Sequence, residues 1–240
     1  MPEDPLLVRV QGVWEELASA PVSFGALGDV DVVASPESRI CPPGWAGLVF
    51  LGGAAIVTAP SEEAAARIRK AVGELPPDKL TDPEVLGRVL PIGEFLGPAA
   101  LAYVAADGFR PVAPGGLCVE QKPHGLAELD DLVRAADAKD ADEAGLDEIT
   151  SPAFIARADG KVVAAAGYRE WPSRTAHLSV LTATAWRGKG FARATGSAAV
   201  RHALEQNLLP QWRARIPASR RVAAGLGFSE LGFQLSVELA

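Results

Sequence analysis

The residues whose types and spacing most clearly suit ligand binding or chemistry lie in one short stretch, Val180 to Arg193. An apolar run ends at Thr182, and a turn with two glycines and two cations follows, before small residues that are typical of a helix. Glycine lets the main chain approach a ligand closely, and the first amides of a helix have no partner within that helix. This combination predicts an anion-binding turn, and a phosphate group would suit it.

The start of that helix has no side chain to cap it. No serine, threonine, aspartate or asparagine stands beside Gly190, so a bound phosphate is the expected acceptor for the free amides. A nucleotide site is an alternative interpretation. It lacks the Gly-Lys-Ser/Thr ending of a phosphate-binding loop, because Gly190 follows Lys189, and no acid pair for magnesium is evident.

The elements around the turn alternate between strand and helix patterns. Residues 117–120 are predicted as a strand, and Leu126, Leu129 and Leu132 show helical spacing. The remaining predictions are helices at 126–136, 143–149 and 191–206 and from Pro217, and strands at 154–156, 162–168, 176–182, 210–215 and 233–239. Asp159-Gly160 is expected to join two of these strands in a hairpin.

The first half of the chain contains recognisable elements but no motif that indicates chemistry. Residues 6–17 fit either a strand or a short helix. We further expect a hairpin around Gly52-Gly53, a helix capped by Ser61, a short helix at Asp82-Pro83 and a strand at 99–104. Residues 109–116 are interpreted as a linker. The chain is therefore predicted to form an α/β lobe of unassigned role at 1–111 and a second domain at 112–240.

Composition narrows the classes of partner. The 240 residues carry a formal net charge of −7, which argues against a nucleic-acid or anionic membrane surface. Cys41 and Cys118 are not spaced as metal ligands, so no metal is expected. The acidic start of the chain is unlike a signal peptide, and no apolar run is long enough to cross a bilayer. We therefore expect a soluble cytoplasmic protein.

The order of elements in residues 112–240, with a glycine-basic turn between the fourth strand and the third helix, resembles the GNAT superfamily of acyl-CoA-dependent N-acyltransferases. The family signature is Arg or Gln, two residues, Gly, one residue, then Gly or Ala. Here it reads Arg187-Gly188-Lys189-Gly190-Phe191-Ala192. The resemblance implies a mixed, splayed β-sheet flanked by helices.

The resemblance also implies a binding site for acyl-CoA, with acetyl-CoA as the expected acyl donor. The pyrophosphate would lie on amides 188–193, near Arg187, Lys189 and Arg193. The pantetheine arm would pair with strand residues 180–182, between splayed fourth and fifth strands. The residues implied for the cofactor are Val180, Leu181, Thr182, Arg187, Gly188, Lys189, Gly190, Phe191, Ala192, Arg193 and Ser219.

Two positions depart from the family pattern. Where a recurring asparagine would precede Ser219 by three residues, this chain has Ile216, which weakens the contact to the CoA arm that the resemblance implies for Ser219. Where many relatives carry a tyrosine that protonates the leaving thiolate, it has Ala223. No general acid is therefore assigned.

His177 is the candidate catalytic base. It lies on the fourth strand, near where some relatives place a catalytic carboxylate, and should share a face with Ser179 and Leu181. Acylation needs a neutral amine, and the ordinary pKa of histidine suits that proton transfer. The alternative is a structural histidine. Glu143, Tyr168 and Glu170 could border the acceptor, but a solvated or structural role is the simpler interpretation.

The leading hypothesis is an N-acetyltransferase that moves an acyl group directly from acyl-CoA to a primary amine, without a covalent enzyme intermediate. A non-catalytic acyl-CoA sensor is the alternative, because the tyrosine and the asparagine are replaced. The N-terminal lobe would be a degenerate copy of the same fold, or else a lid or dimerisation element. The chain is expected to act alone or as a homodimer.

Overall fold

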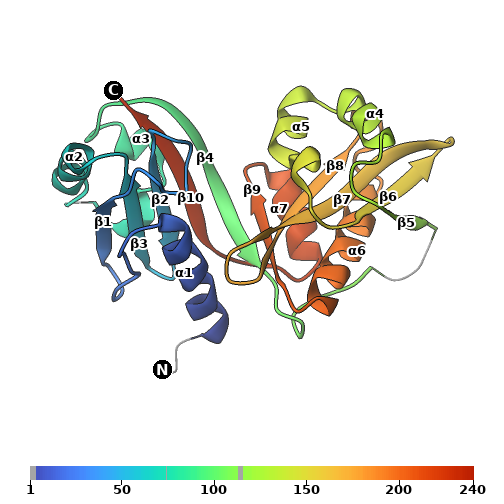
Figure 1. Cartoon of the computed structure of the whole chain (residues 1–240), viewed down its shortest axis with the longest axis horizontal. Coiled ribbons are helices and arrows are strands. Elements are labelled where there is room, and N and C mark those ends of the chain that lie inside the picture. The colour runs from blue at the N-terminus through green and yellow to red at the C-terminus, as the bar shows by residue number, and fades with distance from the viewer. Residues whose placement is uncertain (1–3, 74, 113–115) are drawn as a thin grey trace. The chain divides into compact units, whose positions relative to one another are not determined.

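A computed structural model of the chain describes residues 4–73, 75–112 and 116–240. These residues form two compact units, which can be followed by colour and label in Figure 1. The first unit contains the described residues up to Leu101 together with Glu230–Ala240, and the second contains Ala102–Ser229. Residues 113–115 of the predicted linker lie outside the described residues.

The first unit combines helices with a five-stranded mixed sheet. Its elements are α1 (Pro5–Ala18), β1 (Val30–Ala34), β2 (Ala46–Leu51), β3 (Ala54–Ala59), α2 (Glu62–Val72), a 3-10 turn at Pro77–Lys79, α3 (Pro83–Leu86), β4 (Ile92–Tyr103, whose last two residues belong to the second unit) and β10 (Ser229–Leu239). The strand order is β1-β3-β2-β10-β4, with β1 parallel to β3 and antiparallel pairs between β3 and β2 and between β2 and β10.

Local sequence signals explain several of these elements. Gly52 and Gly53 have φ angles of +61° and +95° in the β2–β3 hairpin, as predicted. The Ser61 side chain accepts a hydrogen bond from the Ala64 amide and begins α2, also as predicted. Residues 6–17, which fitted either a strand or a helix, are helical, because Val10, Val13, Trp14 and Leu17 then fall on one buried face.

The second unit carries the remaining strands and most of the helices. Its elements are β5 (Val119–Lys122), α4 (Glu128–Ala135), α5 (Ala138–Ala144), a 3-10 turn at Leu146–Glu148, β6 (Ala153–Ala158), β7 (Lys161–Trp171), β8 (Thr175–Thr182), a 3-10 turn at Thr184–Trp186, α6 (Phe191–Glu205), β9 (Leu209–Ala214) and α7 (Pro217–Gly225). The strand order is β9-β8-β7-β6-β5, and β8 and β9 are parallel whereas the other pairs are antiparallel.

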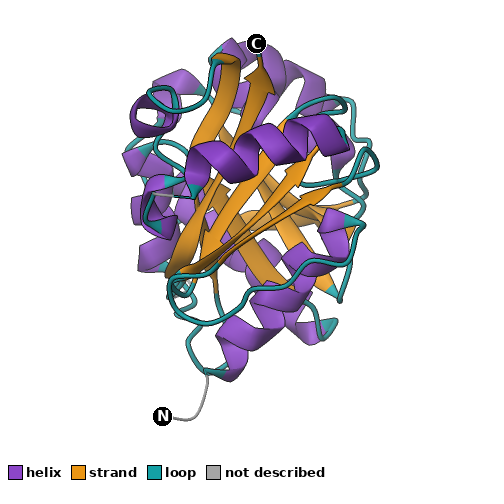
Figure 2. Ribbon diagram, turned by 90° about the vertical axis from the view of Figure 1, so that its left-hand side faces the viewer, coloured by secondary structure: helices purple, strands orange, loops and turns teal. Residues whose placement is uncertain are grey.

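Helices pack on both faces of this second sheet, and Figure 2 shows helices to either side of the strands. Ala166 of β7 packs in one core cluster with Ala199 of α6, whereas its neighbour Ala165 packs in another with Leu132 of α4. Because adjacent strand residues point to opposite faces, α6 and α4 lie on opposite sides of the sheet. The predicted mixed α/β fold, with an open sheet flanked by helices, is thereby confirmed.

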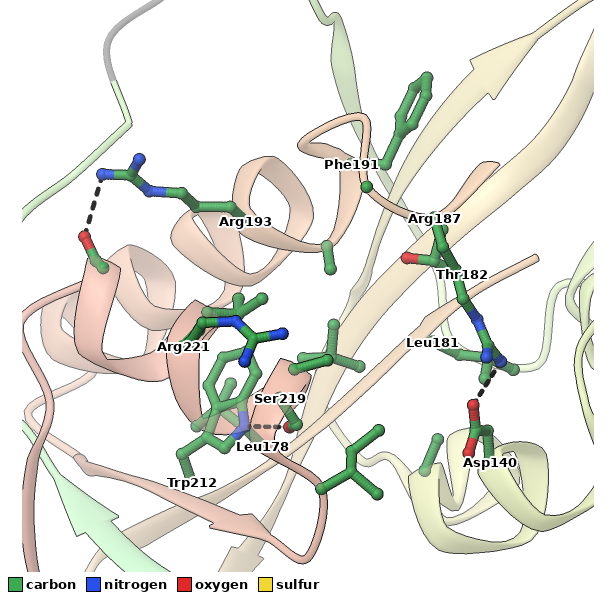
Figure 3. A pocket seen from close by; sticks show the side chains of 18 of the residues that line it. Asp140, Leu178, Leu181, Thr182, Arg187, Phe191, Arg193, Trp212, Ser219 and Arg221 are labelled. Atoms are coloured by element: carbon green, nitrogen blue, oxygen red, sulfur yellow. Dashed lines mark hydrogen bonds and ion pairs between the residues drawn. The ribbon is translucent and has the colours of Figure 1, made fainter. Parts of the chain in front are cut away.

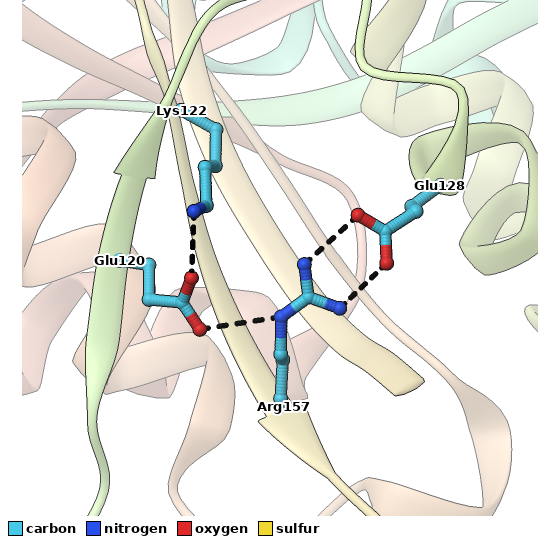
Figure 4. Close-up of polar contacts among 4 residues, drawn as sticks. All are labelled: Glu120, Lys122, Glu128 and Arg157. Atoms are coloured by element: carbon cyan, nitrogen blue, oxygen red, sulfur yellow. Dashed lines mark hydrogen bonds and ion pairs between the residues drawn. The ribbon is translucent and has the colours of Figure 1, made fainter. Parts of the chain in front are cut away.

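An ion-pair network fixes α4 to the sheet edge (Figure 4). The guanidinium of Arg157, on β6, donates to both carboxylate oxygens of Glu128 at 2.6 and 2.8 Å, and its Nε lies 3.2 Å from Glu120 on β5. Lys122 pairs with the same Glu120 at 2.9 Å. A bidentate arginine–carboxylate pair fixes orientation more firmly than a single contact, so this network has a structural role.

Two sequence predictions differ from the structure. The helix expected at 143–149 begins earlier, as α5, because Asp137 caps it and Gly145 ends it with a φ of +53°. The closing strand, expected in the second domain, lies in the first unit, because β10 pairs with β2 along six residues. The compact units therefore differ from a division into 1–111 and 112–240, and the role of the N-terminal lobe remains a prediction.

Candidate functional site

A cavity of about 480 Å³ opens in the second unit where β8 and β9 separate (Figure 3). The two strands pair only from Thr175 to His177 of β8, although β8 continues to Thr182 and β9 to Ala214. The resemblance implies such a splay. The cavity is lined by Asp140, Glu143, Ala144, Leu178, Val180, Leu181, Thr182, Trp186, Arg187, Gly188, Gly190, Phe191, Ala192, Arg193, Trp212, Arg213, Ile216, Ala218, Ser219, Arg221, Val222 and Gly225.

Most of the residues assigned to the cofactor from the sequence line this cavity. Of the residues assigned to the cofactor, Lys189 does not line the cavity. The candidate base His177 does not line it either. The Lys189 ammonium instead lies 4.3 Å from the centre of the Trp186 ring, in a cation–π contact. The turn therefore borders the cavity, as expected. His177 lies in the part of β8 that pairs with β9.

The turn has the backbone geometry that an anion needs. Gly188 and Gly190 have φ angles of +75° and +87°, and a Cβ built on Gly188 would meet no described atom within 4 Å. Gly190 precedes α6, and that helix has no side-chain cap. The helix therefore presents uncapped amides, with the positive end of its dipole, beside open space at the cavity wall.

The charge of the cavity wall favours an anion. Four arginines line it, Arg187, Arg193, Arg213 and Arg221, against two carboxylates, so the wall is locally positive although the chain carries −7 overall. Burial and the neighbouring Arg215 lower the pKa of Arg213, which means that its cationic form is disfavoured where it lies. An anionic ligand would relieve that penalty.

Both carboxylates belong to α5 and form ion pairs. Asp140 pairs with Arg187 of the turn, and Figure 3 shows the two side chains extended toward each other. Glu143 lies 2.9 Å from Arg215, just beyond β9. Partly exposed pairs of this kind contribute only about 0–1 kcal/mol, so a ligand phosphate can exchange with Asp140 at little cost.

A partly buried hydrogen-bond chain closes the fork between the strands. His177 Nδ1 lies 2.6 Å from Gln211 Oε1, and Gln211 Nε2 donates to the Tyr103 hydroxyl at 2.7 Å. The imidazole also stacks on Trp171, with 4.2 Å between ring centroids. Desolvation lowers the pKa of His177 to about 4, against the smaller opposing effect of its hydrogen bond with Gln211.

Trp212 and Gln211 are site residues that sequence reasoning missed. The Trp212 indole N–H donates to Ser219 Oγ at 2.9 Å, so the serine implied as a CoA contact is already held by β9. A Cβ on Gly196 of α6 would lie 3.2 Å from the same indole, which explains the glycine there. The one available signal was Trp212 itself, whose aromatic N–H needs a partner when buried.

The residues present fit a phosphopantetheine ligand. The Thr182 side-chain oxygen is buried with no hydrogen-bond partner among the described residues, and it lies on the strand where the arm would run. A group that accepts or donates a hydrogen bond there would satisfy it. Within the described ranges, no cluster of three or more His, Cys, Asp or Glu could hold a metal ion, and no helix is long and apolar enough to cross a membrane.

Comparison with known proteins finds a family model that matches the part of the chain holding most of this site. The model of the GNAT acetyltransferase family matches residues 152–232. This segment is GNAT-like. The match runs from the beginning of β6 into β10, so it includes the glycine turn, the strand fork and every lining residue of the cavity except Asp140, Glu143 and Ala144. No curated protein matches the chain.

Solved structures of acetyltransferases match parts of this chain at low identity. A GNAT-family structure from Novosphingobium aromaticivorans is 19% identical, with a TM-score of 0.48, and the match covers 61% of this chain and 65% of that one. An acetyltransferase of the GNAT family from Colwellia psychrerythraea is 13% identical, with a TM-score of 0.48 and coverage of 76% and 75%. A structure from Salmonella typhimurium with its cofactor acetyl-CoA is 16% identical, with a TM-score of 0.39 and coverage of 51% and 92%.

The resemblance implies a tyrosine as proton donor, and this chain has Ala223 there. Ala223, at the corresponding position of α7, is only 2% exposed and packs in the same core cluster as Trp212 and Phe228. A methyl group cannot donate a proton, and this one is buried. The source of a proton for the leaving thiolate is therefore not Ala223.

Proposed function

We propose that the chain is an N-acetyltransferase that transfers an acyl group from acetyl-CoA to a primary amine. The observation that carries the proposal is the cavity at the fork of β8 and β9, whose wall holds the glycine turn, the uncapped start of α6 and an excess of arginines. The family match of residues 152–232 supports it. The acceptor and the length of the acyl chain stay open.

In this proposal the turn binds the pyrophosphate. Amides from Gly188 to Arg193 donate to the phosphate oxygens, because the start of α6 has no other acceptor, and Arg187 changes partner from Asp140 to the phosphate. The polar backbone of residues 180–182 and the Thr182 hydroxyl hold the pantetheine arm along β8. Arg221 and Arg213 supply further positive charge on the opposite wall.

When bound, acetyl-CoA supplies an activated acyl group, and a C–N bond to the amine forms as the C–S bond of the thioester breaks. The amine nitrogen gives up a proton in this exchange, so a base is required. His177 is proposed as that base. Its low pKa keeps the imidazole neutral at pH 7, and its place where the strand pairing ends is next to Leu178, the first cavity residue of β8.

A specific observation favours a second candidate function. His177 does not line the cavity in the described structure, and Ala223 replaces the tyrosine acid. A non-catalytic acyl-CoA-binding protein would need the turn and the arginines but neither of these groups. The two functions therefore predict the same cofactor site and differ in turnover.

The test measures binding and turnover on the same protein. Calorimetry with acetyl-CoA and with ATP reports the ligand, and release of free thiol across a panel of primary amines reports transfer. Binding of acetyl-CoA but not ATP, with amine-dependent thiol release, is the expected result. Binding with no thiol release would favour the sensor, and binding of ATP alone would favour a nucleotide site. Absence of acetyl-CoA binding would end the proposal.

A further inference from the structure

Four side chains from four strands form one continuous contact chain at the strand fork. Trp171 stacks on His177, with 8° between the ring planes, and His177 contacts Gln211, which in turn contacts Tyr103. Gln211 and Tyr103 are each 0% exposed. Such a network is costly unless its donors and acceptors are paired, so the donor or acceptor role of each member restricts the role of its neighbour.

The orientation of the Gln211 amide determines where the proton of His177 lies. The amide NH₂ of Gln211 donates to the Tyr103 hydroxyl, so its oxygen faces His177 Nδ1 at 2.6 Å. An amide oxygen only accepts hydrogen bonds, and therefore Nδ1 must carry the hydrogen. A neutral imidazole has a single ring proton, so Nε2 is left with its lone pair. The opposite amide orientation would put the proton on Nε2.

The charges near His177 favour its neutral form. Arg169 faces His177 across the β7–β8 pair and also pairs with Glu148, and Arg213 lies two residues beyond Gln211 on β9. Both cations disfavour the imidazolium form. The stacking and hydrogen-bond partners of the ring, Trp171 and Gln211, are neutral. The imidazole is held neutral and returns a captured proton readily.

We propose that Gln211 is a positioning residue that holds His177 in its Nδ1–H tautomer, so that Nε2 takes the proton of the acceptor amine. This inference rests on the proposed acyl transfer. As the C–N bond forms and the C–S bond breaks, CoA leaves as its thiolate, the N–H proton moves to Nε2, and the imidazolium then releases that proton to solvent. The hydrogen on Nδ1 stays with Gln211 throughout. Trp171 keeps the ring in its plane by stacking.

The tautomer can be measured directly on the full chain without any substrate. The protein has only three histidines, so the ¹⁵N signals of the His177 ring are assigned by their loss in His177→Gln. The expected spectrum at pH 7 shows a protonated Nδ1 and an unprotonated Nε2. A protonated Nε2 would overturn the proposal, because that nitrogen could not then accept a proton.

Two substitutions at one position separate positioning from a structural role. Gln211→Met keeps the length of the side chain but removes the acceptor, and Gln211→Glu keeps an acceptor oxygen. We expect Gln211→Met to lose the tautomer preference and to lower kcat by about tenfold or more, with KM for acetyl-CoA changed by less than about twofold. Gln211→Glu should restore the tautomer and most of kcat, and should raise the pKa of His177 by about one unit or more.

The double variant Gln211→Met/His177→Gln completes the test. If Gln211 acts through His177, the double variant is no slower than His177→Gln alone. Losses of kcat that multiply, or an unchanged kcat in Gln211→Met, would overturn the proposal. Absence of thiol release by the wild-type protein would instead contradict the acyl transfer itself. Wild-type transfer with a protonated Nε2 would contradict only the role of Gln211.

Discussion

The glycine turn and the strand fork border the same cavity but work by different physical means. The turn acts through its backbone, with positive φ angles at Gly188 and Gly190 and uncapped amides at the start of α6. The fork acts through buried side chains, with Gln211 between His177 and Tyr103. The backbone site binds a ligand, whereas the side-chain network determines which ring nitrogen of His177 carries the proton. Damage to the turn should therefore reduce affinity, and damage to the fork should reduce turnover.

The largest effect is expected from the fork. His177→Ala should lower kcat by about 100-fold or more, because a positioned base contributes about 10²–10⁴ to the rate, while the calorimetric Kd for acetyl-CoA stays within about twofold. His202→Ala is the matched control, since that half-buried histidine bonds to the Tyr168 hydroxyl at 2.9 Å outside the cavity. Unchanged turnover in His177→Ala would remove His177 from the mechanism.

The next effect concerns the turn and has an internal control. Gly188 and Gly160 both have φ of +75°, and a Cβ on either would meet no described atom within 4 Å. Valine at either position should lower the free energy of unfolding by about 1–2 kcal/mol through backbone strain. Only Gly188→Val should also weaken acetyl-CoA binding, by about tenfold or more, because its side chain enters the space proposed for phosphate. Equal affinities in the two variants would contradict a role for the turn.

A third prediction concerns pH. The pKa of His177 is lowered to about 4 in the folded state from about 6.5 when unfolded, so the unfolded chain binds the proton first as the pH falls. The free energy of unfolding should therefore decrease as the pH falls from 6.5 to 4. Below pH 4 this group should add no further pH dependence. Urea unfolding across this range checks it. His177→Gln should lose that part of the slope, and an identical slope would show that the ring is solvated.

The smallest effect has the opposite sign. Asp140 holds Arg187 away from the proposed phosphate, so Asp140→Asn should tighten acetyl-CoA binding by up to about fivefold, since such a pair contributes about 0–1 kcal/mol. Glu148→Gln is the control, because its partner Arg169 does not line the cavity. Weaker binding in Asp140→Asn would mean that Asp140 supports the site instead of competing for it.

The turn and the fork also differ in how far the sequence predicts them. The turn is local, so two glycines, the missing cap and the apolar run of β8 marked one stretch in the sequence, and its assigned residues apart from Lys189 line the cavity, together with residues that were not assigned, such as Trp212. The fork joins residues that lie far apart in the chain, since 34 positions separate His177 from Gln211 and 108 separate Gln211 from Tyr103. No local pattern indicates such contacts. His177 was recognised, but its partner was not.

The same distinction explains the errors in the fold. Hairpins and helix caps such as Gly52-Gly53 and Ser61 depend on neighbours in sequence and were predicted. The pairing of β10 with β2 joins residues 232–237 to residues 46–51, far apart in the chain, and the alternating pattern of β10 would suit a strand of either sheet. The helix α5 was predicted to begin too far along the chain, and the cause is local. Asp137 and Gly145 were available as start and stop signals, but no residue of α5 is buried, so no apolar spacing marked the helix.

The central claim is that the turn at the cavity wall binds the pyrophosphate of acetyl-CoA. Calorimetric titration of acetyl-CoA into the wild-type protein at two salt concentrations tests it most directly. The account predicts one saturable site whose affinity falls at higher salt, because arginines and amides hold the phosphates, and no comparable site for ATP. Absence of binding, or an affinity equal to that of Gly188→Val, would contradict it.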